Sequence, residues 1–158
     1  MKRIVTVTSL LLLTSVTVLS QEKNGTIYIS HPNIDAVNKA GEAYINKDDA
    51  TMMQIYSDTA KVWASGMQKP VTIKEAMKMW DGDFDRYDSI KQKPYGYPDY
   101  LEYTKDDAHV VQSWWIWSGK SKKTGQTLKV PFVLFDDFNK DGKIVFESNY
   151  GDWSKLEK

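Results

Sequence analysis

The spacing of apolar and polar positions predicts three helices in the first half of the chain. Apolar residues recur at helical spacing over 34–45, directly after Asn33, a residue type that can cap a helix. A second, shorter helix is predicted over 50–57. The third has the clearest start, because Thr72-Ile73-Lys74-Glu75 has the pattern of a capping box and an apolar stripe continues to Phe84.

The second half of the chain is dominated by apolar and alternating runs that are typical of strands. We expect strands over residues 60–64, 86–92, 108–118, 126–136 and 143–150. Residues 93–99 predict a loop, since they contain two prolines and a glycine, and Asp141-Gly142 predicts a tight hairpin turn. Helices followed by strands indicate an α+β fold in which three N-terminal helices pack on one face of a curved antiparallel sheet.

The strand predicted around residues 110–117 is apolar on both faces. One face carries Val111, Trp115 and Trp117, and the other carries Val110, Trp114 and Ile116. A sheet covered by helices on one side normally has polar residues on its far side. We therefore expect a second copy of the chain to cover the far side, giving a homodimer through the sheet.

Residues 1–20 have the features of a secretion signal. Lys2 and Arg3 precede an apolar run over 4–19 that only Ser and Thr interrupt and that is short for a membrane span. Small residues suit the cleavage site, so we expect cleavage between Ser20 and Gln21. Residues 21–33 then form a polar tether and 34–155 the folded domain. The expected product is exported, periplasmic or secreted, without membrane association after cleavage.

The amino-acid composition argues against several classes of function. The 158 residues include 21 basic and 21 acidic side chains, so no basic excess favours nucleic-acid binding. The absence of cysteine excludes disulfides and thiolate metal sites. His31 and His109, the two histidines, lie in the tether and near a predicted turn, which gives little support for histidine acid–base chemistry. We expect no cofactor.

Two acidic clusters are candidate metal sites. Asp137, Asn139 and Asp141 match the first half of a calcium loop, but Ser148 stands where such a loop needs a glutamate, and a hairpin turn explains the same residues. Acidic residues also crowd the end of the third helix: Asp81, Asp83, Asp85 and Asp88. We expect that helix to end at Gly82 and these acids to be solvated, so no metal site is predicted.

The order of these segments resembles the nuclear transport factor 2-like superfamily, in its SnoaL-like branch. The resemblance is carried by residues 43–49 and 55–62, which look like that family's helix, turn, short helix and first strand, and by 138–144 with Tyr150 and Trp153, which look like its last hairpin. It spans about 34–153. The resemblance implies a pocket between the helices and the concave sheet face. It implies no reaction, because members include enzymes and non-catalytic binders.

The ketosteroid isomerases of that superfamily offer a specific comparison. Aligned on these motifs, the positions of their catalytic groups fall at Gly41, at Ala64 and near Pro131. None of these residues can transfer a proton, so the resemblance does not imply that isomerase chemistry here.

The candidate site residues are aromatic and acidic. As ligand-binding residues we expect Tyr44, Tyr56, Trp63, Trp80, Trp115, Trp117 and Asn149, and as catalytic carboxylates Asp136, Glu147 or Asp152. Alternation places Glu147 and Asn149 on one face of the last strand, opposite Ile144.

Three functions remain open. The first is binding of a small apolar or aromatic ligand without catalysis. The second is an isomerase, cyclase or dehydratase that uses a buried carboxylate, and the third is a sugar-binding module that uses exposed aromatic residues. A carboxylate buried in an apolar pocket favours the enzyme, because burial raises its pKa into a useful range. Exposed tryptophan rings in one plane favour the sugar module.

Overall fold

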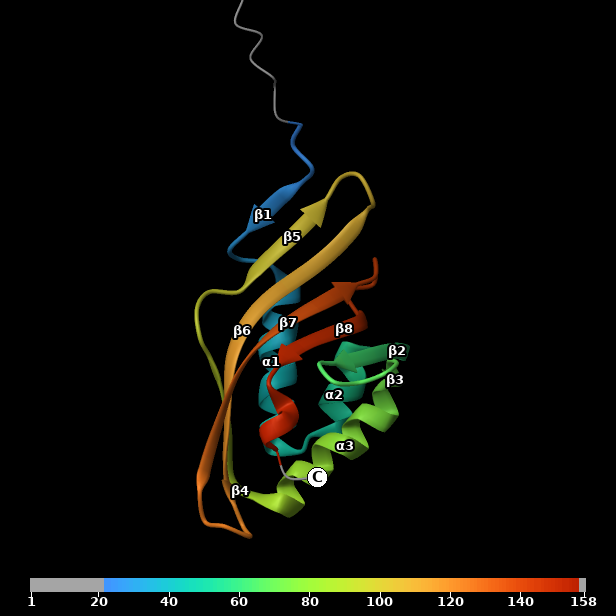
Figure 1. Ribbon diagram of the computed structural model, residues 1–158. Helices are drawn as coiled ribbons and strands as arrows, with labels where there is room; N and C mark the ends of the chain where they lie inside the picture. Colours follow the sequence, from blue (N-terminus) through green and yellow to red (C-terminus); the bar gives the residue numbers. More distant parts are fainter. Residues whose placement is uncertain (1–21, 157–158) are drawn as a thin grey trace, which may run out of the picture.

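Two long strands, β6 (Ala108–Ser121) and β7 (Thr127–Phe138), form the centre of the fold. They pair antiparallel without interruption from His109 opposite Phe138 to Lys120 opposite Thr127. Figure 1 shows them running along the length of the molecule and curving as they go. Both strands are rich in β-branched and aromatic residues, which favour extended backbone on a half-buried surface. The computed structural model describes residues 22–156.

The remaining strands extend this pair on both sides. They are β1 (Thr26–Tyr28), β2 (Tyr56–Ala64), β3 (Val71–Thr72), β4 (Tyr87–Pro94), β5 (Asp99–Tyr103) and β8 (Ile144–Gly151). Across the described residues the order is β1-β5-β6-β7-β8-β2-β3, and β4 also pairs with β6. The α+β fold class is confirmed. The sheet is mixed rather than wholly antiparallel, because β2 runs parallel to β8. Strand β2 follows directly on α2, so the chain enters this edge of the sheet from a helix and not through a hairpin.

The three predicted helices are present as α1 (Pro32–Asn46), α2 (Asp49–Ile55) and α3 (Ile73–Arg86). The capping box at the start of α3 is confirmed, since Thr72 and Glu75 bond to each other's backbone N–H groups. The cap of α1 differs from the prediction. His31, and not Asn33, is the N-cap residue, and its Nδ1 accepts the Asn33 backbone N–H at 3.1 Å. A proline in the first turn fits this start.

Two segments predicted as tether or loop contain strands. Within 21–33, β1 pairs with β5, so this stretch is not a free tether along its whole described length. Strand β5 begins within the predicted 93–99 loop. Both strands are short. Strand β1 gets its hydrogen bonds from a partner distant in sequence, and β5, although it forms a hairpin with β6, directly follows a segment rich in proline and glycine. The proposed signal segment 1–20 lies outside the described residues.

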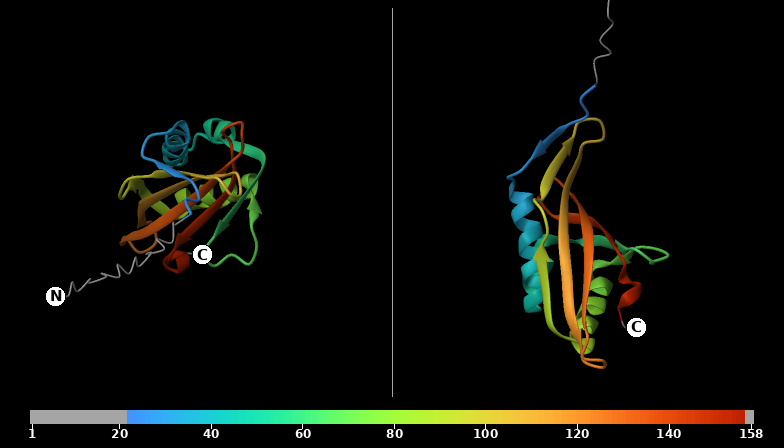
Figure 2. Two further views of the ribbon diagram at one scale, coloured as in Figure 1. Left: turned by 90° about the horizontal axis from the view of Figure 1, so that it is seen from above. Right: turned by 60° about the vertical axis from the view of Figure 1, so that its left-hand side comes forward.

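The two faces of the sheet differ in burial. On β7 alternate residues point into the core, among them Val130, Phe132, Leu134 and Phe138. The helices cover this concave face, as the two views of Figure 2 show. The opposite, convex face carries partly buried apolar residues of β6 and β7, including Trp114 and Phe135. No helix among residues 22–156 is both long and apolar enough to cross a membrane.

Candidate functional site

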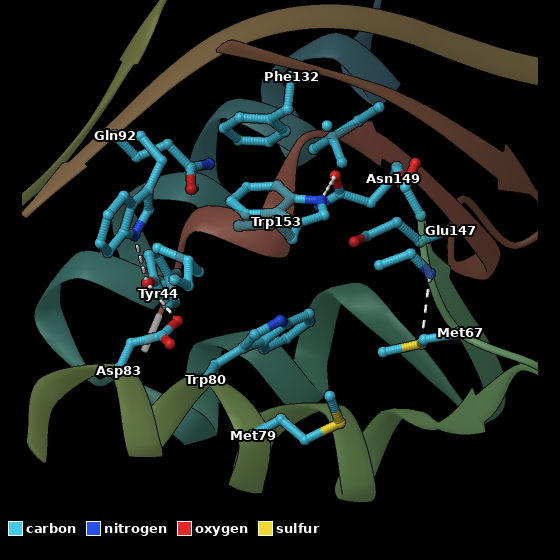
Figure 3. A pocket seen from close by; sticks show the side chains of 18 of the residues that line it. Tyr44, Met67, Met79, Trp80, Asp83, Gln92, Phe132, Glu147, Asn149 and Trp153 are labelled. Carbon is cyan, nitrogen blue, oxygen red and sulfur yellow. Dashed lines mark hydrogen bonds between the residues drawn. The ribbon is translucent and has the colours of Figure 1, made fainter. Parts of the chain in front are cut away.

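A cavity of about 580 Å³ lies between the concave sheet face, α1, α3 and the C-terminal turn. Most of its wall is apolar. The apolar side chains include Val37, Ala40, Met52, Met79, Trp80, Phe132, Leu134 and Ile144. A few polar groups interrupt this wall, and Figure 3 shows them near opposite ends of the cavity. Apolar walls with a small number of placed polar groups are typical of sites for small organic molecules.

Asp136 is the most unusual residue of the cavity wall. It occupies an inward position on β7, between Leu134 and Phe138, and its exposed fraction is 0%. Neither carboxyl oxygen has a hydrogen-bond partner among the described residues. Burial raises the pKa of Asp136 well above its usual range, and the charge of nearby Glu147 raises it further. Both effects favour the protonated, neutral form of Asp136.

Glu147 pairs with Asp136 across β7 and β8, and its carboxyl points into the cavity. Its exposed fraction is 4%, compared with 0% for Asp136 beside it on β7, so Glu147 is the more accessible of the two carboxyl groups. The Tyr56 hydroxyl donates a hydrogen bond to Glu147 Oε2. Burial raises the pKa of Glu147 to about 7, and the Tyr56 hydrogen bond opposes this rise because it favours the charged carboxylate.

A second polar cluster lies at the other end of the cavity. The Tyr44 hydroxyl donates to Asp83 Oδ2 at 3.0 Å and accepts the Trp117 indole N–H at 2.8 Å. Arg86 donates to Asp83 Oδ1, also at 3.0 Å. Burial raises the pKa of Asp83, and these hydrogen bonds oppose the rise. The cluster fixes the Tyr44 ring against the cavity.

The C-terminal turn closes part of the cavity mouth. Trp153, at the start of the 3₁₀ turn η1 (Trp153–Lys155), packs its ring 5.1 Å from that of Phe132. Its indole N–H donates to Asn149 Oδ1 at 3.0 Å, as drawn in Figure 3. A Cβ at Gly151 would lie only 2.9 Å from the Trp153 ring and 3.0 Å from Phe132, so this close approach requires glycine.

The candidate residues from the sequence are distributed over the cavity and its surroundings. Those that line it are Tyr44, Tyr56, Trp80, Trp117, Asn149, Asp136, Glu147 and Asp152. Asp152 lies at the mouth, more than half exposed, and pairs with Lys155. Trp115 lies behind the wall, where its indole N–H donates to Ser113. Trp63 packs against Tyr150 on the convex side of the sheet.

Ile144 corrects the predicted alternation of the last strand. It is fully buried and lines the cavity with Glu147 and Asn149, although alternation placed it on the opposite face. The reason is a bulge: Asp137 pairs with Phe146, but the next residue of β7 pairs with Ile144. The extra residue in β8 reverses the facing of the strand.

Three residues of the site were not singled out from the sequence. For Gln92 and Trp153, no local sequence pattern indicates that they line the cavity. Asp83 was expected to be solvated beyond a helix that ends at Gly82, but α3 continues to Arg86 and turns Asp83 toward Tyr44. Its spacing of seven residues from Ala76 on the buried face was an available signal.

The structure also describes the predicted hairpin turn, the acidic clusters and the exposed aromatic residues. The Asp141-Gly142 turn is a confirmed hairpin turn, in which Asn139 Oδ1 accepts two backbone N–H groups. No group of three or more His, Asp or Glu side chains within 22–156 is arranged to hold a metal ion. The large aromatic side chains exposed in this range are tyrosines, such as Tyr97 at 87%, and include no tryptophan.

Comparisons with known proteins agree with this architecture. The sequence matches no family model and no curated protein at a significant level. Solved structures do match. IdmH from Streptomyces antibioticus, described as a putative polyketide cyclase, has a TM-score of 0.66 at 14% identity and covers 80% of this chain and 96% of its own.

Two further structures show the same similarity. AclR from Streptomyces galilaeus, described as a putative hydroxylase, has a TM-score of 0.61 at 14% identity, covering 80% of this chain and 98% of its own. An NTF2-like protein of unknown function from Exiguobacterium sp. 255-15 has a TM-score of 0.58 at 19% identity, covering 74% and 98%. The chain therefore has the fold of these structures, the nuclear transport factor 2-like fold that the sequence resemblance implies.

Proposed function

We propose that this protein binds a small, largely apolar carbonyl compound in the cavity and that Glu147 exchanges a proton with it. The observation that carries the proposal is a carboxyl group that faces an apolar cavity while it is almost completely buried. Such a group needs a reason to be there, because an unpaired buried carboxylate destabilises the fold. Of the three functions considered from sequence, the one with a buried carboxylate is supported best.

The two carboxyl groups have different roles in this proposal. Tyr56 hydrogen-bonds Glu147 and favours its charged form, while Asp136 has no hydrogen-bond partner among the described residues. Asp136 is therefore the group that stays protonated and Glu147 the one that changes its charge near neutral pH. A proton-transfer group works best when its pKa is close to the working pH. In this proposal Asp136 is a positioning residue, because its carboxyl has no exposed surface and lies beside Glu147.

The chemistry that suits this arrangement is proton removal next to a carbonyl. The Glu147 carboxylate takes the proton, the electron pair of the C–H bond passes to the carbonyl oxygen, and an enolate forms. Return of the proton to the same or another carbon completes exchange or isomerisation. The description of IdmH as a putative polyketide cyclase is consistent with carbonyl chemistry on this fold, although the fold alone fixes no reaction.

A proton-exchange experiment tests the proposal. The probe is 2-acetylnaphthalene in D2O, and the measurement is deuterium incorporation into its methyl group by NMR, with binding followed by thermal shift. We expect Glu147→Gln to reduce enzyme-dependent exchange by about a hundredfold. Asp58→Asn is the matched control and should leave the exchange rate unchanged, because Asp58 is exposed on β2 and does not line the cavity. Binding without exchange in the wild type would leave a ligand-binding protein and remove the catalytic part of the proposal.

Export of the chain is also a proposal. It is supported by the basic start and the apolar run over 4–19. Fusing residues 1–20 to alkaline phosphatase, which is active only outside the cytoplasm, tests it. We expect activity from the fusion and its loss when Leu11 and Leu12 are replaced by Arg. An inactive wild-type fusion would refute export.

A further inference from the structure

The side-chain amide of Gln92 has no hydrogen-bond partner among residues 22–156 although it lines the cavity. Gln92 lies on β4, opposite Trp117 of β6, and Figure 3 shows its amide directed toward the middle of the cavity. The residue is only half-buried, so water or a ligand can reach the amide. An amide carries two N–H donors and one acceptor oxygen, all available here to a bound molecule.

The neighbouring side-chain oxygens are already paired, and buried Arg86 Nε is the one neighbouring donor among the described residues that lacks a partner. The Tyr44 hydroxyl bonds to both Asp83 and Trp117, and the second Asp83 oxygen accepts from Arg86. A ligand would have to break these bonds in order to use Tyr44 or Asp83. Gln92 can bind a ligand without such a loss, and its half-buried amide is more accessible than the fully buried Arg86 Nε, which is why Gln92 is the better placed of the two to recognise a ligand.

Space for the Gln92 side chain comes from a glycine on the facing helix. A Cβ at Gly41 of α1 would lie 3.2 Å from Gln92 Nε2 and 3.3 Å from the Trp115 ring. Glycine inside a helix costs about 0.5–1 kcal/mol relative to alanine. At Gly41 the missing side chain leaves room for Gln92 to extend over the helix into the cavity.

Gln92 and Glu147 lie at opposite ends of the cavity. Gln92 pairs with Trp117, which pairs with Val130 on β7, whereas Glu147 pairs with Asp136 on the same strand. Residues 130 and 136 are about 20 Å apart along the strand at about 3.3 Å per residue, and the curvature of the sheet and the inward reach of the two side chains shorten the gap that a ligand has to span. One ligand that contacts both side chains is still elongated, with polar groups at its two ends.

The charge around Gln92 favours a neutral group. The Asp83 carboxylate and the Arg86 guanidinium form an ion pair at 3.0 Å, so neither charge is left over for a charged ligand. We propose that Gln92 determines specificity: it hydrogen-bonds a hydroxyl or carbonyl group at the end of the ligand remote from the carbonyl that faces Glu147. This inference rests on the proposed function, and it narrows the ligand to an elongated, neutral molecule with a hydrogen-bonding group at each end.

A pair of probes isolates this contact. One is 4-acetyl-4′-hydroxybiphenyl, and the other is 4-acetylbiphenyl, which lacks the hydroxyl. We expect the wild type to bind the hydroxyl probe about tenfold more tightly, and Gln92→Leu to bind both alike. Gln112→Leu is the matched control, because Gln112 is also half-buried on a strand but does not line the cavity. Affinities are measured by isothermal titration calorimetry.

A second measurement does not depend on the variant's folding. In the wild type labelled with ¹⁵N, the Gln92 side-chain amide resonance should shift with the hydroxyl probe and much less with 4-acetylbiphenyl. Equal wild-type affinities for the two probes, or a hydroxyl preference that survives in Gln92→Leu, would overturn the role of Gln92 and leave ligand binding intact. Failure of both probes to bind the wild type would overturn the proposed function and this inference together.

Discussion

Asp136 and Glu147 face each other across the β7–β8 pair with both carboxyl groups on the buried side of the sheet. Two carboxyl groups in one apolar site cannot both be charged without a large cost, so the pair is most stable with at least one proton. Tyr56 breaks the symmetry because it donates its hydrogen bond only to Glu147. Burial thus favours the neutral form of Asp136, whereas Tyr56 favours the charged form of Glu147 beside it.

This pair predicts that the protein loses stability as the pH rises. A carboxyl whose pKa is raised by folding stabilises the folded state fully below its unfolded pKa of about 4, and this contribution disappears as the pH rises through the raised pKa. Burial raises the pKa of both Asp136 and Glu147. The stabilisation that they contribute is therefore lost progressively as the pH rises from about 4 to above 7.

The substitution Asp136→Asn tests this directly, since asparagine cannot ionise. Relative to wild type, we expect its free energy of unfolding to increase with pH and to exceed the wild-type value by about 1 kcal/mol at pH 8. Denaturant unfolding at pH 5 and pH 8 gives the comparison. Asp58→Asn, exposed on β2, is the control and should not change the pH dependence. A parallel pH dependence in Asp136→Asn and wild type would contradict the assignment.

Removing the Tyr56 hydroxyl should change the pKa of Glu147 in a direction that the hydrogen bond between them determines. Tyr56→Phe removes a hydrogen bond that favours the charged carboxylate, so the pKa of Glu147 should rise further above its usual range. The ¹³C shift of the Glu147 carboxyl, followed through a pH titration, measures it. Tyr44→Phe, at the other end of the cavity, should leave that titration unchanged. An unchanged or lower midpoint in Tyr56→Phe would show that the hydrogen bond does not control Glu147.

Local signals predicted the parts of this structure that depend on neighbouring residues in sequence. The capping box at Thr72 and the Asp141-Gly142 turn are each formed within a few residues, so the sequence alone was sufficient. Strand β5 was missed because a loop rich in proline and glycine leads into it and because one of its partners, β1, is distant in sequence, although the other, β6, follows it in a hairpin.

The site was less predictable because it depends on packing between distant elements. Asp136 was a candidate from its place in the chain, and the clearer signal was its inward position in the alternating apolar stripe of β7. The facing of Ile144 was wrong because a single bulge reverses the alternation. Asp83 required knowledge that Tyr44, 39 residues earlier, would lie against it.

The position of Trp153 against Phe132 leads us to expect that the C-terminal turn controls access to the cavity. Trp153→Ala removes the contact with Phe132 and the hydrogen bond to Asn149, and should cost about 1–2 kcal/mol of stability because the ring is only partly buried. Gly151→Ala should displace the same ring through the clash of its Cβ.

The measurement is the fluorescence of the apolar dye anilinonaphthalene sulfonate. We expect it to increase several-fold in both variants as the cavity opens, while Trp114→Ala on the convex face gives no such increase in the folded protein. Dye fluorescence equal to wild type in Trp153→Ala would mean that the turn does not limit entry.

The convex face of the sheet supports the proposal of a homodimer. Phe135, Ser148 and Tyr150 line a hollow of about 320 Å³ there, and Tyr150 packs against both Phe135 and Trp63 while remaining half exposed. Apolar surface of this kind is unusual on a face that nothing covers, and a second copy presents a surface of the same composition to it.

Sedimentation equilibrium of the chain without residues 1–20 at micromolar concentration tests the dimer. We expect twice the monomer mass for the wild type and the monomer mass for Tyr150→Lys, because a dimer through this face would desolvate the new charge on both subunits. Tyr97→Lys, on an exposed loop, is the control and should remain dimeric. Since Tyr150 is already half exposed, its replacement should leave the monomer folded, which circular dichroism checks. A wild-type monomer across the concentration range would refute the dimer, and the convex aromatic residues would then belong to the monomer surface alone.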